Sequence, residues 1–145
     1  MTKTIDDGPL DVLTISPEQV CFVVVKAREL NAKDESSATN SGSNASDDKE
    51  ISILEDRPGD AVEAELRGLI AALSSDEQID LVTLTWLGRG DGSAADWNEL
   101  RDEAQRAHNT ETASYLLGNP LLADHLEEGL SLLGFSCAEF EINRL

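Results

Sequence analysis

The stretch that decides the fold is SSDEQIDLVTLTWLGRGDGSAADWNELRDEAQRAH, residues 74–108. Ser75, followed three positions later by Gln78, has the spacing of a capping box and predicts a helix over 76–87. Three glycines then interrupt the pattern: Gly88, Gly90 and Gly92. A second helix is predicted over about 94–108, because Trp97, Leu100 and Ala104 recur at intervals of three and four. The stretch therefore reads as helix, glycine corner, helix.

Upstream, SPEQ at 16–19 combines a serine N-cap, a proline at the first helical position and a capping-box glutamine. It predicts a helix to about Leu30, which we expect to be the most buried of the set. The β-branched run 20–25 makes a buried strand the competing interpretation. Residues 1–15 are expected to form a flexible N-terminal arm, with a strand at 10–15 as a weak alternative. Residues 33–50 are rich in Ser, Asn and Asp without apolar period, and predict a long disordered loop.

Further helices are indicated downstream. Asp60 can cap a helix over 61–73, Thr110 a short one to Leu117, and Asn119–Pro120 can begin another that Gly134 ends. Ser136 with Glu139 has the spacing of a last capping box. Together these patterns predict an all-α fold: one compact bundle of five to six helices over 16–140, with the helices beginning near 17 and 76 at its centre, and a frayed C-terminus at 141–145.

The composition restricts the classes of function. The chain carries 29 acidic against 11 basic residues, a net charge of −18. It therefore lacks the basic surface that direct nucleic-acid binding or anionic membranes require. Its two cysteines, Cys21 and Cys137, are far apart in sequence and are expected to be unpaired. Residues 1–15 show no apolar signal segment, so we expect a cytoplasmic protein.

The corner GRGDG, residues 88–92, is the first place where a site could lie. It follows a helix rather than a strand and lacks the P-loop lysine, and its spacing does not fit an EF-hand. The favoured interpretation is a tight turn whose glycines take positive φ values. If a polar site exists, its candidate residues are Arg89, Asp91, Asp96 and Glu99.

No pattern points to catalysis, a metal or a cofactor. His108 and His125 lack the Glu-x-x-His and HExxH spacings, and no nucleophile motif occurs. We therefore assign no catalytic, cofactor-binding or metal-binding residue and favour a non-enzymatic protein. The segment around Tyr115 and Leu121 reads as a helix corner, with a groove for a partner helix as the alternative.

Three blocks carry a resemblance: SPEQVCFVVVKAREL, DEQIDLVTLTWLGRGD and TASYLLGNPLLADHLEEGL. In this order they resemble an uncharacterised alphaproteobacterial family that is known only as a domain of unknown function (number 3775). The resemblance covers about 16–140. It implies a single domain in a bacterial cytoplasm, and it implies no activity, cofactor or partner.

Three hypotheses for function follow. The preferred one is a small acidic interaction or regulatory protein that binds a protein partner or forms a homodimer. The alternatives are a small-ligand or ion-binding protein, or a weak hydrolase, that uses the 88–92 corner, and a DNA mimic that binds a nucleic-acid-binding protein.

Overall fold

The computed structural model describes residues 12–43 and 60–138, with the side chains of 34–43 left out. The described chain is helical and contains no strand, which confirms the all-α prediction. The alternative strands are absent at 20–25 and at the described part of 10–15. Its helices are α2 (Pro17–Ser43), α4 (Asp60–Ala72), α5 (Ser75–Arg89), α6 (Trp97–Ala107), α7 (Thr112–Leu117) and α8 (Leu122–Leu132). A 3-10 turn, Ala94–Asp96, precedes α6. No helix in these residues is both long and apolar enough to cross a membrane.

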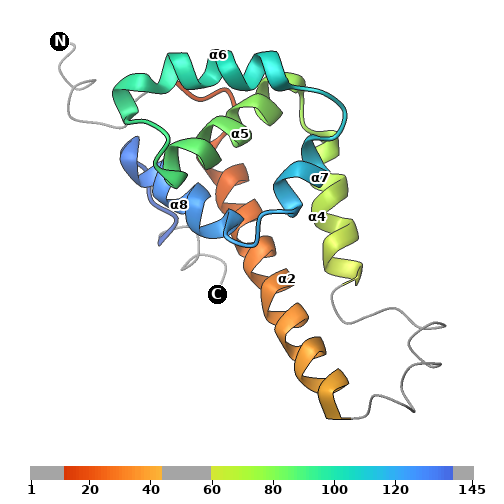
Figure 1. Cartoon of the computed structure of the whole chain (residues 1–145). Coiled ribbons are helices and arrows are strands. Elements are labelled where there is room, and N and C mark those ends of the chain that lie inside the picture. Colours follow the sequence, from red (N-terminus) through yellow and green to blue (C-terminus); the bar gives the residue numbers. More distant parts are fainter. Residues whose placement is uncertain (1–11, 44–59, 139–145) are drawn as a thin grey trace.

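The helices pack around α5 and α8, which cross in the middle of the molecule (Figure 1). α6 lies over α5, while α7 lies between α5 and α4. The first half of α2 packs against α8 and α4, and its second half projects away from the other helices.

Glycines allow α5 and α8 to approach closely. A Cβ atom at Gly88 of α5 would lie 1.8 Å from the carbonyl oxygen of His125, and one at Gly129 of α8 would lie 2.4 Å from the carbonyl oxygen of Leu84. Both distances are far below van der Waals contact. Each helix therefore needs a glycine where it meets the backbone of the other.

α5 is the most enclosed helix of the described bundle. Eight of its 15 residues are buried, including Asp80, Thr83 and Thr85. The two threonines satisfy their hydroxyl groups within the helix, by donating to the carbonyls of Ile79 (2.7 Å) and Leu81 (2.8 Å). The prediction that the helix beginning near 17 would be the most buried was wrong, because α2 leaves the core after its first half and α5 is buried over most of 79–87.

The predicted N-caps were right in one case and displaced in three. At Ser16 the capping box forms as expected, with Ser16 Oγ accepting from Gln19 N at 3.1 Å. Ser74, not Ser75, caps α5. Its Oγ accepts a hydrogen bond from Glu77 N at 3.1 Å, and Glu77 Oε1 accepts one from Ser74 N. The sequence contains two overlapping capping-box patterns, Ser74 with Glu77 and Ser75 with Gln78, and the structure forms the first. α7 begins after Glu111 without a side-chain cap, so Thr110 does not cap it. α8 begins at Leu122 without a side-chain cap, so Asn119 does not cap it, although Asn119 Oδ1 accepts from Leu121 N at 3.0 Å.

The predicted end of the first helix near Leu30 was also wrong. α2 continues to Ser43, so the expected loop is helical over 33–43, and its remaining residues, 44–50, lie outside the described chain. Residues 31–41 contain no proline or glycine, and Gly42 is the first strong helix breaker after Pro17. Polar composition predicted exposure there, and exposure does not by itself end a helix. The Ser136–Glu139 box lies partly outside the described residues, although Ala138 N does donate to Ser136 Oγ.

Asp80, in the first half of α5, connects three segments of the chain. Its side chain is fully buried, and Oδ2 accepts from the backbone N–H groups of Thr14 and Ile15. Its other oxygen, Oδ1, accepts from Arg101 Nε of α6 at 2.8 Å. Thr14 and Ile15, which the sequence placed in the flexible arm, are thus fixed against α5, and Ile15 is buried.

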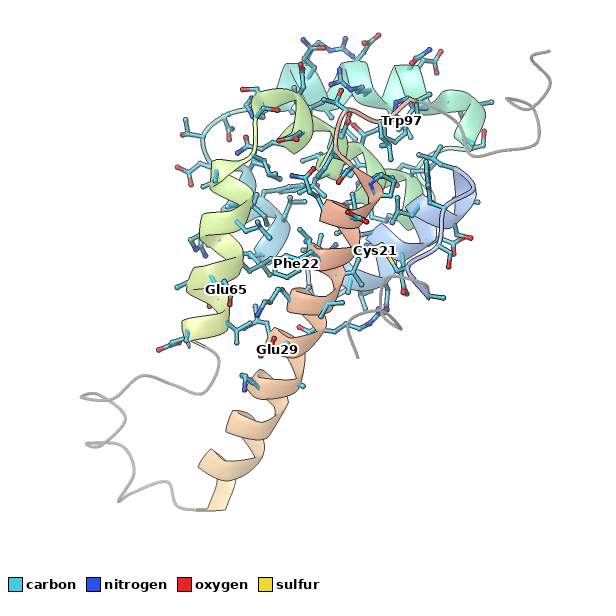
Figure 2. The ribbon with its side chains drawn as sticks, turned by 180° about the vertical axis from the view of Figure 1, so that it is seen from behind. Cys21, Phe22, Glu29, Glu65 and Trp97 are labelled. Atoms are coloured by element: carbon cyan, nitrogen blue, oxygen red, sulfur yellow. A yellow bond between two sulfur atoms is a disulfide. The ribbon has the colours of Figure 1, made fainter. Side chains whose placement is uncertain are left out.

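The two cysteines form a disulfide, contrary to the prediction that they are unpaired. Cys21 on α2 and Cys137 after α8 have Cα atoms 5.6 Å apart, and both residues are buried. Figure 2 shows the Cys21 side chain directed toward α8. The prediction failed because a sequence separation of 116 says nothing about distance once α2 packs on α8.

Candidate functional site

The four candidate residues of the corner do not converge on one point. Arg89 and Asp91 form an ion pair, Arg89 Nη2 to Asp91 Oδ2 at 2.5 Å. Asp96 instead closes the turn before α6, accepting from Ser93 N at 2.8 Å and from Ser93 Oγ at 3.2 Å. Glu99 is exposed on α6. The corner therefore contains one ion pair, between Arg89 and Asp91, and a turn that is stabilised by the hydrogen bonds between Ser93 and Asp96.

The corner glycines serve different purposes. Gly90 has a φ of 100° and ends α5 in the left-handed conformation, as predicted. Gly88 and Gly92 do not have positive φ. Gly88 is required by the close approach of α8, which no local pattern in the sequence could reveal.

The Arg89–Asp91 pair belongs to a longer network on α5, α7 and α8. Trp86 Nε1 donates to the hydroxyl of Tyr115 at 2.8 Å, so the two aromatic rings of α5 and α7 are held together. The pKa of Arg89 is raised above its ordinary value, mainly by its hydrogen bond with Asp91 and further by Tyr115. The pKa of Asp91 is lowered, mainly by the hydrogen bond from Arg89, with a smaller contribution from the charge of His125. We call Trp86, Arg89, Asp91, Tyr115 and His125 the corner network.

The two histidines have separate partners. His125 Nδ1 lies 3.1 Å from Asn119 Nδ2, at the start of α8. His108, the C-cap of α6, places Nε2 2.7 Å from Gln78 Oε1 of α5. Within the described chain no group of three or more His, Cys, Asp or Glu residues could hold a metal ion.

A small cavity of about 170 Å³ lies between α5, α6 and α7. We call it the α5–α7 cavity. Its walls include two aromatic side chains, two small or apolar ones and two polar ones: Trp86, Tyr115, Val82, Ala104, His108 and Glu111. Most of its lining is apolar. The sequence did not reveal it, because its walls come from three separate segments, and only the presence of Trp86 and Tyr115 outside the main apolar stripes hinted at a role.

A second apolar recess of about 300 Å³ lies between α2 and α4, beside Phe22, Leu69 and Leu73. Figure 2 shows Glu29 and Glu65 on the two helices beside this seam. Lys26 bridges them, at 3.4 Å from Glu29 and 3.0 Å from Glu65, and hydrogen bonding to Glu65 is the main reason that the pKa of Lys26 is raised. This arrangement ties α2 to α4.

A third recess of about 340 Å³ lies on α8 and the chain that follows it, beside three carboxylates and Phe135. Two of these carboxylates are already paired with Arg28 of α2, Asp124 at 2.8 Å and Glu127 at 3.0 Å. These two ion pairs join α2 to α8, so the two carboxylates of the recess already have a partner.

Comparison with known proteins adds a family and no activity. Residues 63–135, half of the chain, match the family described as "Protein of unknown function (DUF3775)". No curated protein and no solved structure gives a significant match. The matched segment runs from α4 through α8 and contains the corner network and the α5–α7 cavity. The chain therefore belongs to the DUF3775 family of proteins of unknown function.

Proposed function

We propose that this protein is a non-enzymatic interaction module that binds a protein partner through the corner between α7 and α8. The observation that carries the proposal is a pair of large side chains exposed at that corner: Tyr115 is 49% exposed and Leu121 is 52% exposed. Tyrosine is among the residues most often used as anchors in protein interfaces.

The connection between these two residues is braced. Asn119 Oδ1 accepts from Leu121 N at 3.0 Å, and the side chain of Asn119 also contacts His125. Tyr115 is held in place as well, because its hydroxyl accepts a hydrogen bond from Trp86 Nε1. A surface that is ordered before binding loses less conformational entropy when the partner arrives.

The charge of the chain favours one kind of partner. A net charge of −18 attracts a protein with a basic surface and speeds its association at low salt. Two copies of this chain repel one another for the same reason, so we favour a basic partner over a homodimer. The test below separates the two.

The test compares three proteins as baits with quantitative mass spectrometry. The double variant Tyr115→Ser, Leu121→Ser removes the proposed anchors, while Leu132→Ser changes an equally apolar residue of α8 that is 44% exposed. We expect a basic protein to be retained by the wild type and by Leu132→Ser, to be lost by the double variant, and to elute as salt is raised. Identical sets of proteins on all three baits would disprove the proposed surface.

Light scattering of the purified wild type at low and high salt tests self-association. A monomer at both salt concentrations is expected. A dimer that the double variant abolishes would replace the basic partner with a second copy of this chain.

The other two hypotheses lack such an observation. At the 88–92 corner Arg89 is already paired with Asp91, which leaves no unpaired cation there for an anionic ligand. A DNA mimic needs carboxylates spaced like phosphates on one face. Several carboxylates here are instead paired with Lys26, Arg28, Arg67 and Arg101.

We also propose a bacterial, cytoplasmic location, on the family resemblance alone. The disulfide bears against it, because cytosolic thiols are usually kept reduced. Trapping of free thiols in intact cells decides the matter. Because both cysteines are buried in the folded protein, the cells are quenched with acid and the protein is alkylated in denaturant. Alkylation of both cysteines without prior reduction is then expected for a reducing cytoplasm, and protection of both would move the protein to an oxidising compartment.

A further inference from the structure

We propose that the α5–α7 cavity binds a small alkylammonium ion. The inference goes beyond the proposed function and does not depend on it, because it rests on the chemistry of the cavity walls. At about 170 Å³ the cavity is well below the roughly 300–1,000 Å³ of sites for drug-sized ligands, so its ligand has few heavy atoms.

The hydrogen-bond pattern determines which nitrogen of His108 is left as an acceptor. Gln78 donates through Nε2 to the carbonyl of Ile70 at 2.9 Å, so its Oε1 is the atom that faces His108. An amide oxygen only accepts, and His108 Nε2 must therefore carry the hydrogen of that bond. In the neutral ring Nδ1 is then an acceptor, and no described residue donates to it.

Other side-chain donors of the wall are also engaged. Trp86 Nε1 donates to Tyr115, and Thr112 Oγ1 donates to the carbonyl of Asn109 at 3.1 Å. The donors that remain, the Asn109 amide and the Tyr115 hydroxyl, belong to exposed side chains. The acceptors that remain are His108 Nδ1 and the carboxylate of Glu111. Glu111 is also exposed, but its carboxylate has no partner among the described residues, whereas the Tyr115 hydroxyl is already bonded to Trp86.

The electrostatics of the cavity favour a positive ligand. Glu111 is its one charged wall residue, and neither lysine nor arginine lines it. The cavity lies at the C-terminus of α6, which ends at Ala107, and the last carbonyls of a helix carry a partial negative charge. The aromatic rings of Trp86 and Tyr115 attract cations through their faces. Acceptors, aromatic faces and an apolar wall together suit an N–H-bearing cation with a short alkyl chain.

The probe is n-butylammonium chloride, titrated at constant ionic strength into uniformly ¹⁵N-labelled protein. The two tryptophan indole signals report separately: Trp86 lines the cavity, whereas Trp97 is 3% exposed and lies in the core. We expect a saturable shift of the Trp86 signal with a Kd of about 10 mM or tighter, while the Trp97 signal stays in place. The neutral 1-butanol and the anionic butyrate should bind at least roughly tenfold more weakly, since neither supplies a positive charge to the acceptors.

A pair of matched variants separates the site from the general acidity of the chain. Glu111→Gln removes the wall carboxylate, and Glu103→Gln removes an exposed carboxylate of α6 that does not line the cavity. Both lower the net negative charge by one. We expect roughly fivefold weaker binding for Glu111→Gln, the upper range for one exposed charge pair, and unchanged binding for Glu103→Gln.

Three results would overturn the proposal. They are the absence of a saturable Trp86 shift, equal affinity for n-butylammonium and 1-butanol, and equal weakening by the two glutamine variants. The second would indicate a merely apolar recess, and the third a diffuse attraction to the acidic surface.

Discussion

Replacing Asp80 by alanine should destabilise the fold far more than any exposed acidic substitution. The carboxylate is completely buried and accepts three hydrogen bonds, from Thr14 N, Ile15 N and Arg101 Nε. Its removal leaves the buried amide of Ile15 and the Nε–H group of Arg101 without their acceptor, while Arg101 Nη2 keeps its contact with Asp76. Breaking a buried charge pair from one side costs about 3–5 kcal/mol. We take the lower end, about 3 kcal/mol, because the Arg101 side chain is 22% exposed and can partly rehydrate.

The measurement is urea unfolding followed by far-ultraviolet circular dichroism. A loss of about 3 kcal/mol is a large part of the roughly 5–15 kcal/mol that holds a domain of this kind folded, so the midpoint should fall clearly. Asp76→Ala is the matched control: Asp76 also pairs with Arg101, at 3.3 Å, but its side chain is 65% exposed. It should change stability by less than about 0.5 kcal/mol.

A double-mutant cycle with Arg101→Met tests the pairing itself. Because Asp80 and Arg101 share one partly buried contact, their coupling energy should exceed about 1 kcal/mol. If Asp80→Ala costs less than about 1 kcal/mol, or no more than Asp76→Ala, then Asp80 does not anchor the N-terminal segment and α6 to α5.

Further predictions concern other contacts and are checked by the same urea assay. Gly129→Ala should lower the free energy of unfolding by about 1–3 kcal/mol or more, because the new methyl group overlaps a carbonyl of α5. Gly68→Ala, whose methyl group meets open space on α4, should be neutral or stabilising. Equal effects of the two substitutions would contradict the close helix crossing. Reduction by dithiothreitol should lower stability by up to about 5 kcal/mol on the loop-entropy model for a separation of 116 residues, and Cys137→Ser should be insensitive to the reductant; an unchanged wild-type midpoint would contradict the pairing. Asp91→Asn should cost less than about 1 kcal/mol near neutral pH, since the ion pair is exposed. The pKa of Asp91 is lowered in the folded state by Arg89, so this contribution is present above the ordinary pKa of 3.8 and lost as pH falls through the folded value; a difference between variant and wild type that persists in stronger acid would refute it.

The helices could be predicted where local chemistry decides them. Ser16 with Pro17 and Gln19 forms a start signal that needs no knowledge of the rest of the chain, and the structure uses it. Gly134, with a φ of 99°, ends α8 as its position after Leu133 suggested. The ambiguity between Ser74 and Ser75 shows the limit of this kind of reasoning, because two equivalent local solutions lie one residue apart.

Features that depend on tertiary contacts could not be predicted. Asp80 stands among apolar residues in IDLVTL, and a buried carboxylate there becomes reasonable only when Thr14, Ile15 and Arg101 arrive from elsewhere. The apolar pattern of α5 is also masked by Thr83 and Thr85, which are buried although polar.

The candidate site divides in the same way. Arg89 and Asp91 are neighbours in sequence and meet in the structure, so their pairing could be anticipated. Their connection to Tyr115 and His125 could not, since it requires α7 and α8 to pack beside the end of α5. The α5–α7 cavity requires three elements to meet, and it is the feature that sequence reasoning missed completely.

The disulfide makes most of the chain a covalent ring. Because Cys21 and Cys137 are joined, residues 22–136 form a closed loop, and it contains every described helix from α4 to α8 and most of α2. A protease that cuts this loop once opens the ring without releasing either fragment. The cleaved protein would migrate as one species on a denaturing gel and separate into two only after reduction.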